Sequence, residues 1–144
     1  VYKRQNFMIC RDAFLKVRFD ETFHLGYEDT LFGMQLEQAG VEILHIDNPV
    51  YHLVEENSEQ FLMKIRRAVR NLDGHIEQMH SHVKLLRWYA CVKRLGMAPL
   101  VAFLFRNNEK RLVSNLTSRR PSLKLFAFYK LGYLCNFLSQ KKPD

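Results

Sequence analysis

Two adjacent carboxylates, Glu28 and Asp29, are the residues of this sequence best suited to chemistry. They follow Gly26 and open an apolar helical pattern that ends at Gly40, so we expect them in the first turn of a helix. A carboxylate held there can act as a general base when a substrate hydroxyl comes within hydrogen-bonding distance. Most such pairs only cap the helix or offset its dipole. The pair alone leaves a structural role and a catalytic role both open.

His52 is the second candidate, because it lies in a predicted strand over residues 50–53 that leads into two glutamates. Strand ends often present side chains to a site, although a lone histidine is more often structural than a ligand. His80 and His82 are predicted on a helix, where a spacing of two turns their rings to different faces, so joint metal binding is not expected. His45 is predicted to be a core residue within an apolar strand.

The elements around these candidates change character near residue 57. Residues 6–10 and 41–46 are apolar enough for short buried strands. Residues 11–15, directly after the first of these, are predicted to form a helical turn. We therefore expect an α+β fold, predominantly helical, in which residues 1–57 form a first unit.

Residues 58–144 are predicted to be a basic, helical extension. Ser58 is a good N-cap, and the helix after it is expected to break at Asp73-Gly74. A second helical stripe and an apolar run then lead into a predicted basic turn at residues 106–111. A last helix is expected over residues 123–138.

The charge of the 144 residues is divided between the same two parts. Residues 1–57 carry ten acidic and five basic side chains, whereas residues 58–144 carry seventeen basic and five acidic ones. A basic second part favours phosphates or an anionic membrane surface as a partner. The length fits one domain with a moderate core, and the start at Val1 suggests a piece of a longer protein.

The cysteines Cys10, Cys91 and Cys135 are far apart and odd in number. Neither a disulfide framework nor a zinc site follows, and buried, reduced thiols in a cytosolic setting fit best. No signal peptide is visible, and no apolar stretch is long enough to span a bilayer. We therefore expect the protein in the cytoplasm.

The order of short motifs in the first part resembles the second half of a family 2 glycosyltransferase, a bacterial enzyme of the GT-A fold that uses a nucleotide-sugar donor. The resemblance covers about residues 5–57, and it is specific in combination although each piece alone is weak. The motifs are Asn6-Phe7-Met8-Ile9 with Arg11, Phe14-Leu15-Lys16, Arg18-Phe19-Asp20-Glu21, Gly26-Tyr27-Glu28-Asp29-Thr30 with Phe32-Gly33, and His45-Ile46-Asp47-Asn48-Pro49-Val50 with His52. Residues 58–144 loosely resemble the extension of capsule and lipopolysaccharide-type members.

This resemblance implies a role for each candidate residue. Asp29 would be the general base that takes the proton of the acceptor hydroxyl, and Glu28 would position acceptor hydroxyls. His52 would help to bind the divalent metal, Mn or Mg, or the donor diphosphate. The implied reaction is an inverting hexosyl transfer to a sugar or a lipid-linked acceptor in surface polysaccharide synthesis.

The sequence also departs from the family. The nucleotide-binding first half is missing, and no Asp-x-Asp metal motif occurs in these residues. We therefore expect residues 1–57 to be only the acceptor-side remnant of a GT-A domain, with little or no metal bound and no turnover by the chain alone. Strand edges left without their neighbours would favour self-association.

The aromatic residues of the second part have two interpretations. Together with nearby arginines and lysines, they suit helices that rest on a membrane surface at the inner face of the plasma membrane. They equally suit a helical bundle packed against the first part. The residues concerned are Phe103, Phe105, Phe126, Phe128, Tyr129, Tyr133 and Phe137.

A function of a different class stays open beside the enzyme. The excess of basic residues after residue 57 also suits a non-enzymatic helical module that binds nucleic acid or a protein partner. Against this alternative, the basic residues form no stripe that follows a groove, and the sequence contains no recognised nucleic-acid motif.

Overall fold

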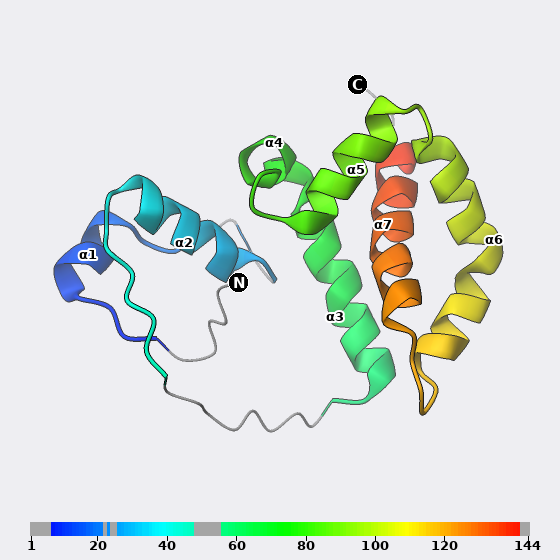
Figure 1. The fold of residues 1–144 in the computed structure, drawn as a ribbon, viewed down its shortest axis with the longest axis horizontal. Coiled ribbons are helices and arrows are strands. Elements are labelled where there is room, and N and C mark those ends of the chain that lie inside the picture. Colours follow the sequence, from blue (N-terminus) through cyan, green and yellow to red (C-terminus); the bar gives the residue numbers. More distant parts are fainter. Residues whose placement is uncertain (1–6, 22, 24–25, 48–55, 142–144) are drawn as a thin grey trace.

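A computed structural model describes residues 7–21, 23, 26–47 and 56–141 (Figure 1). Two helices near the N-terminus lie beside a larger bundle in which α6 and α7 pack against each other and α3 packs against α7. The elements are α1 (Arg11–Lys16), α2 (Glu28–Gln38), α3 (Ser58–Asn71), the 3-10 turn η1 (Asp73–His75), α4 (Ile76–Met79), α5 (Lys84–Arg94), α6 (Ala98–Leu116) and α7 (Leu123–Gln140).

The predicted α+β fold is wrong, because the described residues contain no strand. Residues 7–10 and 41–47 have no regular structure, and the apolar side chains of Met8, Leu44 and Ile46 are 99%, 80% and 71% exposed. A strand needs a neighbour to pair its backbone groups, and no described segment provides one. The short strands of a GT-A remnant are therefore absent from this part of the chain, and the predicted strand at residues 50–53 lies outside the described residues.

The helix predicted after Gly26 is confirmed as α2. It buries one apolar face through Leu31, Phe32, Met34 and Leu36, and it ends before Gly40, whose φ of 67° only glycine adopts readily. Glu28 and Asp29 occupy its first turn, as the sequence predicts.

The first part of the chain has a small aromatic cluster of its own. The rings of Phe19 and Phe32 stack with centroids 4.2 Å apart, and Phe14 meets the edge of Phe32 at 6.2 Å. Phe7 lies 6.3 Å from Phe32 on another side. These contacts hold α1 and the loop after it against α2, and such aromatic pairs contribute about 0.5–1.5 kcal/mol each beyond their burial.

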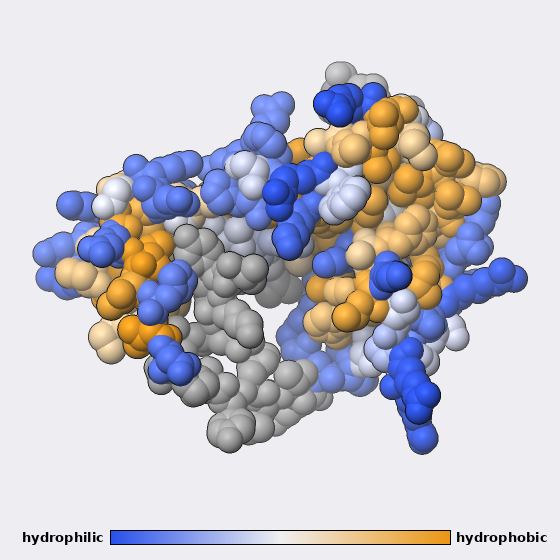
Figure 2. All heavy atoms as spheres, in the orientation of Figure 1, coloured by the Kyte–Doolittle hydropathy of each residue, from blue (hydrophilic) through white to orange (hydrophobic). Residues whose placement is uncertain are grey.

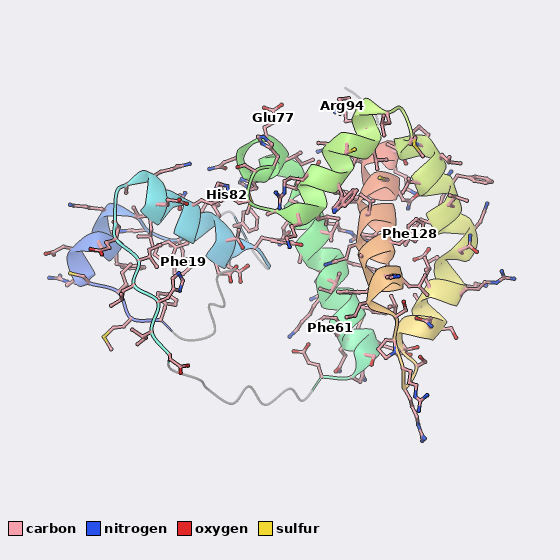
Figure 3. All side chains as sticks on the ribbon, in the orientation of Figure 1. Phe19, Phe61, Glu77, His82, Arg94 and Phe128 are labelled. Carbon is pink, nitrogen blue, oxygen red and sulfur yellow. The ribbon has the colours of Figure 1, made fainter. Side chains whose placement is uncertain are left out.

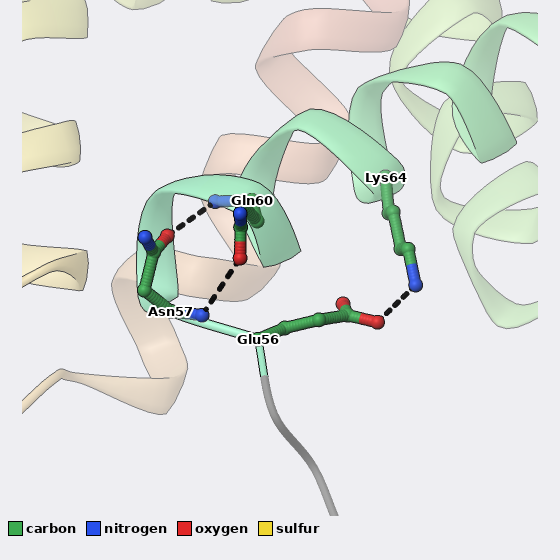
Figure 4. A network of polar contacts seen from close by, with 4 residues as sticks. All are labelled: Glu56, Asn57, Gln60 and Lys64. Carbon is green, nitrogen blue, oxygen red and sulfur yellow. Dashed lines mark hydrogen bonds and ion pairs between the residues drawn. The ribbon is translucent and has the colours of Figure 1, made fainter.

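Helix α3 begins one residue earlier than its predicted cap implies. Asn57, not Ser58, is the N-cap: its side chain accepts from the backbone N–H of Gln60 at 2.9 Å, and the Gln60 side chain accepts from the Asn57 N–H at 3.1 Å (Figure 4). This reciprocal capping box satisfies two of the N–H groups that a helix start leaves free. An ion pair between Glu56 and Lys64 links the residue before the cap to the second turn of α3.

The predicted break after α3 is confirmed, but the region after it is less helical than expected. Asp73-Gly74 falls in η1, and α4 is a single turn. His80 and His82 then lie in a turn, not on a helix, before α5 begins at Lys84. The buried side chains of Met79, Val83 and Leu86 still keep this region on the core.

The basic turn predicted at residues 106–111 is wrong, because α6 continues through it to Leu116. Leu112 and Leu116 extend the buried stripe that begins with Val101 and Phe105, so the helix keeps the same face on the core beyond its polar stretch. The charged residues occupy the outer face. Packing on the core thus keeps residues 106–111 helical, although their polarity alone predicts a turn.

The core centres on α6 and α7. Phe105 and Tyr129 are fully buried, and their rings meet edge to face with centroids 5.5 Å apart. Gly132 on α7 permits this approach, since a Cβ there would lie 2.7 Å from the Cβ of Phe105. The same hydrophobic cluster includes Leu31 and Met34 of α2, so residues on both sides of the predicted boundary at residue 57 share one core.

Candidate functional site

The carboxylate pair is positioned by a left-handed turn. Gly26 and Tyr27 have φ angles of 80° and 71°, and the side chain of Tyr27 packs against the core. A left-handed residue with a side chain costs about 1–2 kcal/mol, so surrounding contacts must hold it. One such contact is close: a Cβ on Gly26 would lie 2.3 Å from the Cβ of Ala68 on α3. The turn is therefore pressed against the bundle, and it fixes where α2 starts.

Glu28 and Asp29 follow this turn directly, and both side chains are half-buried. Asp29 Oδ1 accepts a long contact of 3.4 Å from the hydroxyl of Thr30. Glu28 Oε2 is buried and has no hydrogen-bond partner among the described residues. A buried carboxylate oxygen without a donor is costly, so this atom needs a partner that the described residues do not supply.

Tyr27 is a residue of this site that the sequence argument missed. Its phenol is protonated near neutral pH at the ordinary pKa of 10.0, and burial raises the pKa further, so the hydroxyl can donate a hydrogen bond there. The sequence signal that could have identified Tyr27 is its position, between a turn-forming glycine and the two acids. A bulky residue with a positive φ at such a turn is uncommon.

The predicted metal ligand His52 lies outside the described residues, so its position relative to Asp29 stays a prediction. Among the residues that the structure describes, no group of three or more His, Cys, Asp or Glu side chains is arranged to hold a metal ion. The resemblance implies a Mn or Mg site at His52, and that residue is not among those the structure describes. No step of the chemistry is therefore derived through a metal.

The other histidines have ordinary contacts. His75 lies 4.6 Å from the ring of Phe23, and His80 Nδ1 lies 2.7 Å from the carbonyl oxygen of Glu77. His82 reaches toward α2, where its Nε2 is 3.7 Å from Glu37 Oε2 (Figure 3). His45 is exposed, so its predicted place in the core is wrong. The strand that was expected to bury it does not form.

The cysteines are free thiols, but only Cys135 is buried. The prediction of buried thiols is wrong for Cys10 and Cys91, which are exposed because residue 10 precedes α1 without regular structure and residue 91 lies on the outer face of α5.

A polar seam joins α3 to α7 within the bundle. Arg66 Nε donates to the Tyr129 hydroxyl at 2.6 Å, and Arg66 Nη2 donates to Glu109 Oε1 at 2.6 Å. One turn along, Arg70 Nε donates to the Tyr133 hydroxyl at 2.6 Å. These bonds give the buried phenols their partners and hold in place the helix on which Gly26 rests.

Two shallow hollows of the described surface lie away from the carboxylates. A shallow groove of about 350 Å³ lies between α6 and α7, and one of about 230 Å³ lies between α4 and α5. The α6–α7 groove is lined by Leu104, Asn108, Arg111, Leu112, Leu125 and Phe128. Neither groove includes Asp29, so any substrate cleft at the carboxylates involves surfaces other than these two.

No protein-family model, curated protein or solved structure matches this chain. Any function assigned to this chain therefore rests on its residues and their geometry.

Proposed function

We propose that this chain provides the acceptor side of an inverting sugar transferase, with Asp29 as the general base. The observation that carries the proposal is the strained turn at Gly26 and Tyr27, which holds two neighbouring carboxylates at the start of α2. Strained backbone kept in place by close packing is typical of functional sites. The resemblance to family 2 glycosyltransferases supports the same assignment.

In this reaction Asp29 accepts the proton of an acceptor hydroxyl as its oxygen attacks the anomeric carbon of the donor sugar. The bond from that carbon to the nucleoside diphosphate breaks, and the diphosphate leaves on the opposite face with the bonding electrons. One displacement inverts the anomeric configuration. Glu28 binds a neighbouring acceptor hydroxyl through its half-buried carboxylate.

The described residues do not provide a donor-binding layer, so the proposal requires that another part of the protein binds the nucleotide sugar. We therefore expect no transfer from these 144 residues alone. A sugar-transfer assay in which they turn over a nucleotide sugar by themselves would contradict this expectation.

The test compares Asp29→Asn with the wild type in protein expressed from the complete reading frame. Transfer from a panel of nucleotide sugars should fall about a hundredfold or more, because the amide cannot take the proton. Thermal stabilisation by the donor should be kept, because Asp29 faces the acceptor. Acceptor binding should weaken in Glu28→Gln, with a smaller effect on the maximal rate.

Asp12→Asn is the matched control, since Asp12 is also an aspartate in the first turn of a helix, α1. It removes the same charge near a helix N-terminus and should leave transfer unchanged. Unaltered transfer in Asp29→Asn, or an equal loss in Asp12→Asn, would remove Asp29 from the mechanism.

A further inference from the structure

An exposed apolar corner is formed where α5 gives way to α6. Leu95 and Met97 are 61% and 44% exposed, and Leu100, Phe103 and Leu104 at the start of α6 are 50%, 52% and 42% exposed. We call these five residues the α5–α6 corner. Figure 2 shows hydrophobic side chains gathered over the α5, α6 and α7 side of the molecule, with hydrophilic ones at its edge.

The corner continues into a polar stripe along the same face of α6. Leu100, Phe103 and Leu104 recur at the helical spacings of three and four, and Asn107, Lys110 and Arg111 extend this outer face toward the C-terminal half. The opposite face, with Val101 and Phe105, is buried in the core. The outer face of α6 is therefore apolar at one end and basic at the other.

The charge around the corner is almost entirely of one sign. Residues 78–143 contain thirteen Lys or Arg side chains and a single acidic residue, Glu109, which is paired with Arg66. Lys93 and Arg94 immediately precede the corner, and Arg106 follows it. Arg94 lies at the end of α5 beside the turn into α6 (Figure 3).

The aromatic residues first considered for membrane contact differ in burial, and Phe126, Phe128 and Phe137 are half-buried. Phe105, Tyr129 and Tyr133 are buried in the core, so they are not available to a surface partner. Phe103 is exposed. The middle of α7 is therefore not available for membrane contact, and the α5–α6 corner is the candidate membrane-binding surface.

From these observations we propose that the α5–α6 corner binds the surface of an anionic lipid bilayer. Its apolar side chains enter the interface, and the basic residues beside them pair with lipid phosphates. No single described helix is long and apolar enough to cross a membrane; α5 and α6 reach that composition only together, across a bend of 116°. This inference does not require the sugar transfer proposed above.

A second copy of the chain suits this surface less well. A symmetric contact through the corner would bring Lys93, Arg94 and Arg106 of both copies together, and like charges in a partly desolvated contact are unfavourable. The partner must combine an apolar layer with negative charge. A bilayer containing anionic lipid meets both requirements.

The experiment measures co-sedimentation of the chain with vesicles of phosphatidylcholine alone, or with about 30% phosphatidylglycerol, at about 50 mM and 500 mM salt. Trp88 on α5 is 65% exposed and is the sole tryptophan of the sequence, so its emission reports contact near the corner. Leu100→Glu tests the corner. Leu15→Glu is its matched control, because Leu15 is a helical leucine on α1 that is 46% exposed.

We expect binding to the anionic vesicles, a blue shift of Trp88 emission, and weaker binding at high salt. Leu100→Glu should lower the affinity about tenfold or more, and Leu15→Glu should leave it unchanged. Absence from the anionic vesicle pellet at low salt overturns the proposal. So does binding that Leu100→Glu leaves intact, or that Leu15→Glu weakens equally. A lipid-free dimer that Leu100→Glu dissociates assigns the corner to a second copy and also overturns it.

Discussion

Cys135 shows how a single buried side chain links stability to pH. It lies on α7 with 2% of its surface exposed, and burial raises the pKa of its thiol from 9.0 to about 11. Well below pH 9 the thiol is protonated in both the folded and the unfolded chain, so its contribution to the free energy of unfolding is complete there. Between pH 9 and 11 the unfolded chain releases the proton first, and the free energy of unfolding should fall by about 2–3 kcal/mol.

Urea unfolding from pH 8 to about pH 11 of the wild type and Cys135→Ala measures this slope. The variant should lose the part due to the thiol, together with the part of the raised pKa of Tyr89 that Cys135 causes. Tyr27 and Tyr129, whose pKa burial also raises, contribute equally to both proteins. Cys91→Ala is the control, because Cys91 is an exposed thiol. If Cys135→Ala keeps the wild-type slope, the thiol does not titrate as its burial requires.

At the scale of the element, the start of α3 has two candidate N-caps, Asn57 and Ser58. Local pattern favours Ser58 as the cap, but the hydrogen bonds belong to Asn57 and Gln60. Asn57→Ala should therefore lower the free energy of unfolding by about 1 kcal/mol, whereas Ser58→Ala should leave it nearly unchanged. Urea denaturation of the two variants decides between them, and the reverse order would restore Ser58 as the cap.

Helices were predictable where the apolar period is strong, and strands were not. The amphipathic stripe of α3 can be recognised from its spacing, and α7 from its long apolar run. Residues 41–46 have the composition of a strand but remain irregular and largely exposed, because strand formation depends on a neighbour that composition does not specify. The helix at the polar middle of α6 was not predicted, because the buried residues that keep it helical lie before and after it in the sequence.

At the scale of the whole molecule, the candidate site depends on a contact that local sequence does not reveal. The carboxylates at the start of α2 were identifiable from the sequence as a pair in a first helical turn. The left-handed turn before them is held by Ala68, some forty residues away on α3. The two parts of the chain, which differ in charge, contact each other here through the close approach of Gly26 to Ala68 and through the shared hydrophobic core.

The closeness of Gly26 to Ala68 gives the sharpest test of this arrangement. Gly26→Ala should cost about 2–5 kcal/mol, because the new methyl group meets Ala68 at 2.3 Å and the residue has a φ of 80°. Gly40→Ala is the matched control: its φ of 67° gives a similar backbone cost, but nothing lies within 4 Å of its added Cβ. That variant should lose only about 1–2 kcal/mol.

Combining Gly26→Ala with Ala68→Gly separates the steric part from the backbone part. The second substitution alone should cost about 1 kcal/mol, as glycine does within a helix. In the double variant the contact at 2.3 Å is removed and the nearest atom is the Cα of residue 68 at 3.1 Å, so the total loss should be smaller than the sum of the single losses by about 1–3 kcal/mol. Additive losses, or a Gly26→Ala variant no less stable than Gly40→Ala, would show that the start of α2 does not rest on α3. The position assigned to Glu28 and Asp29 would then have no structural support.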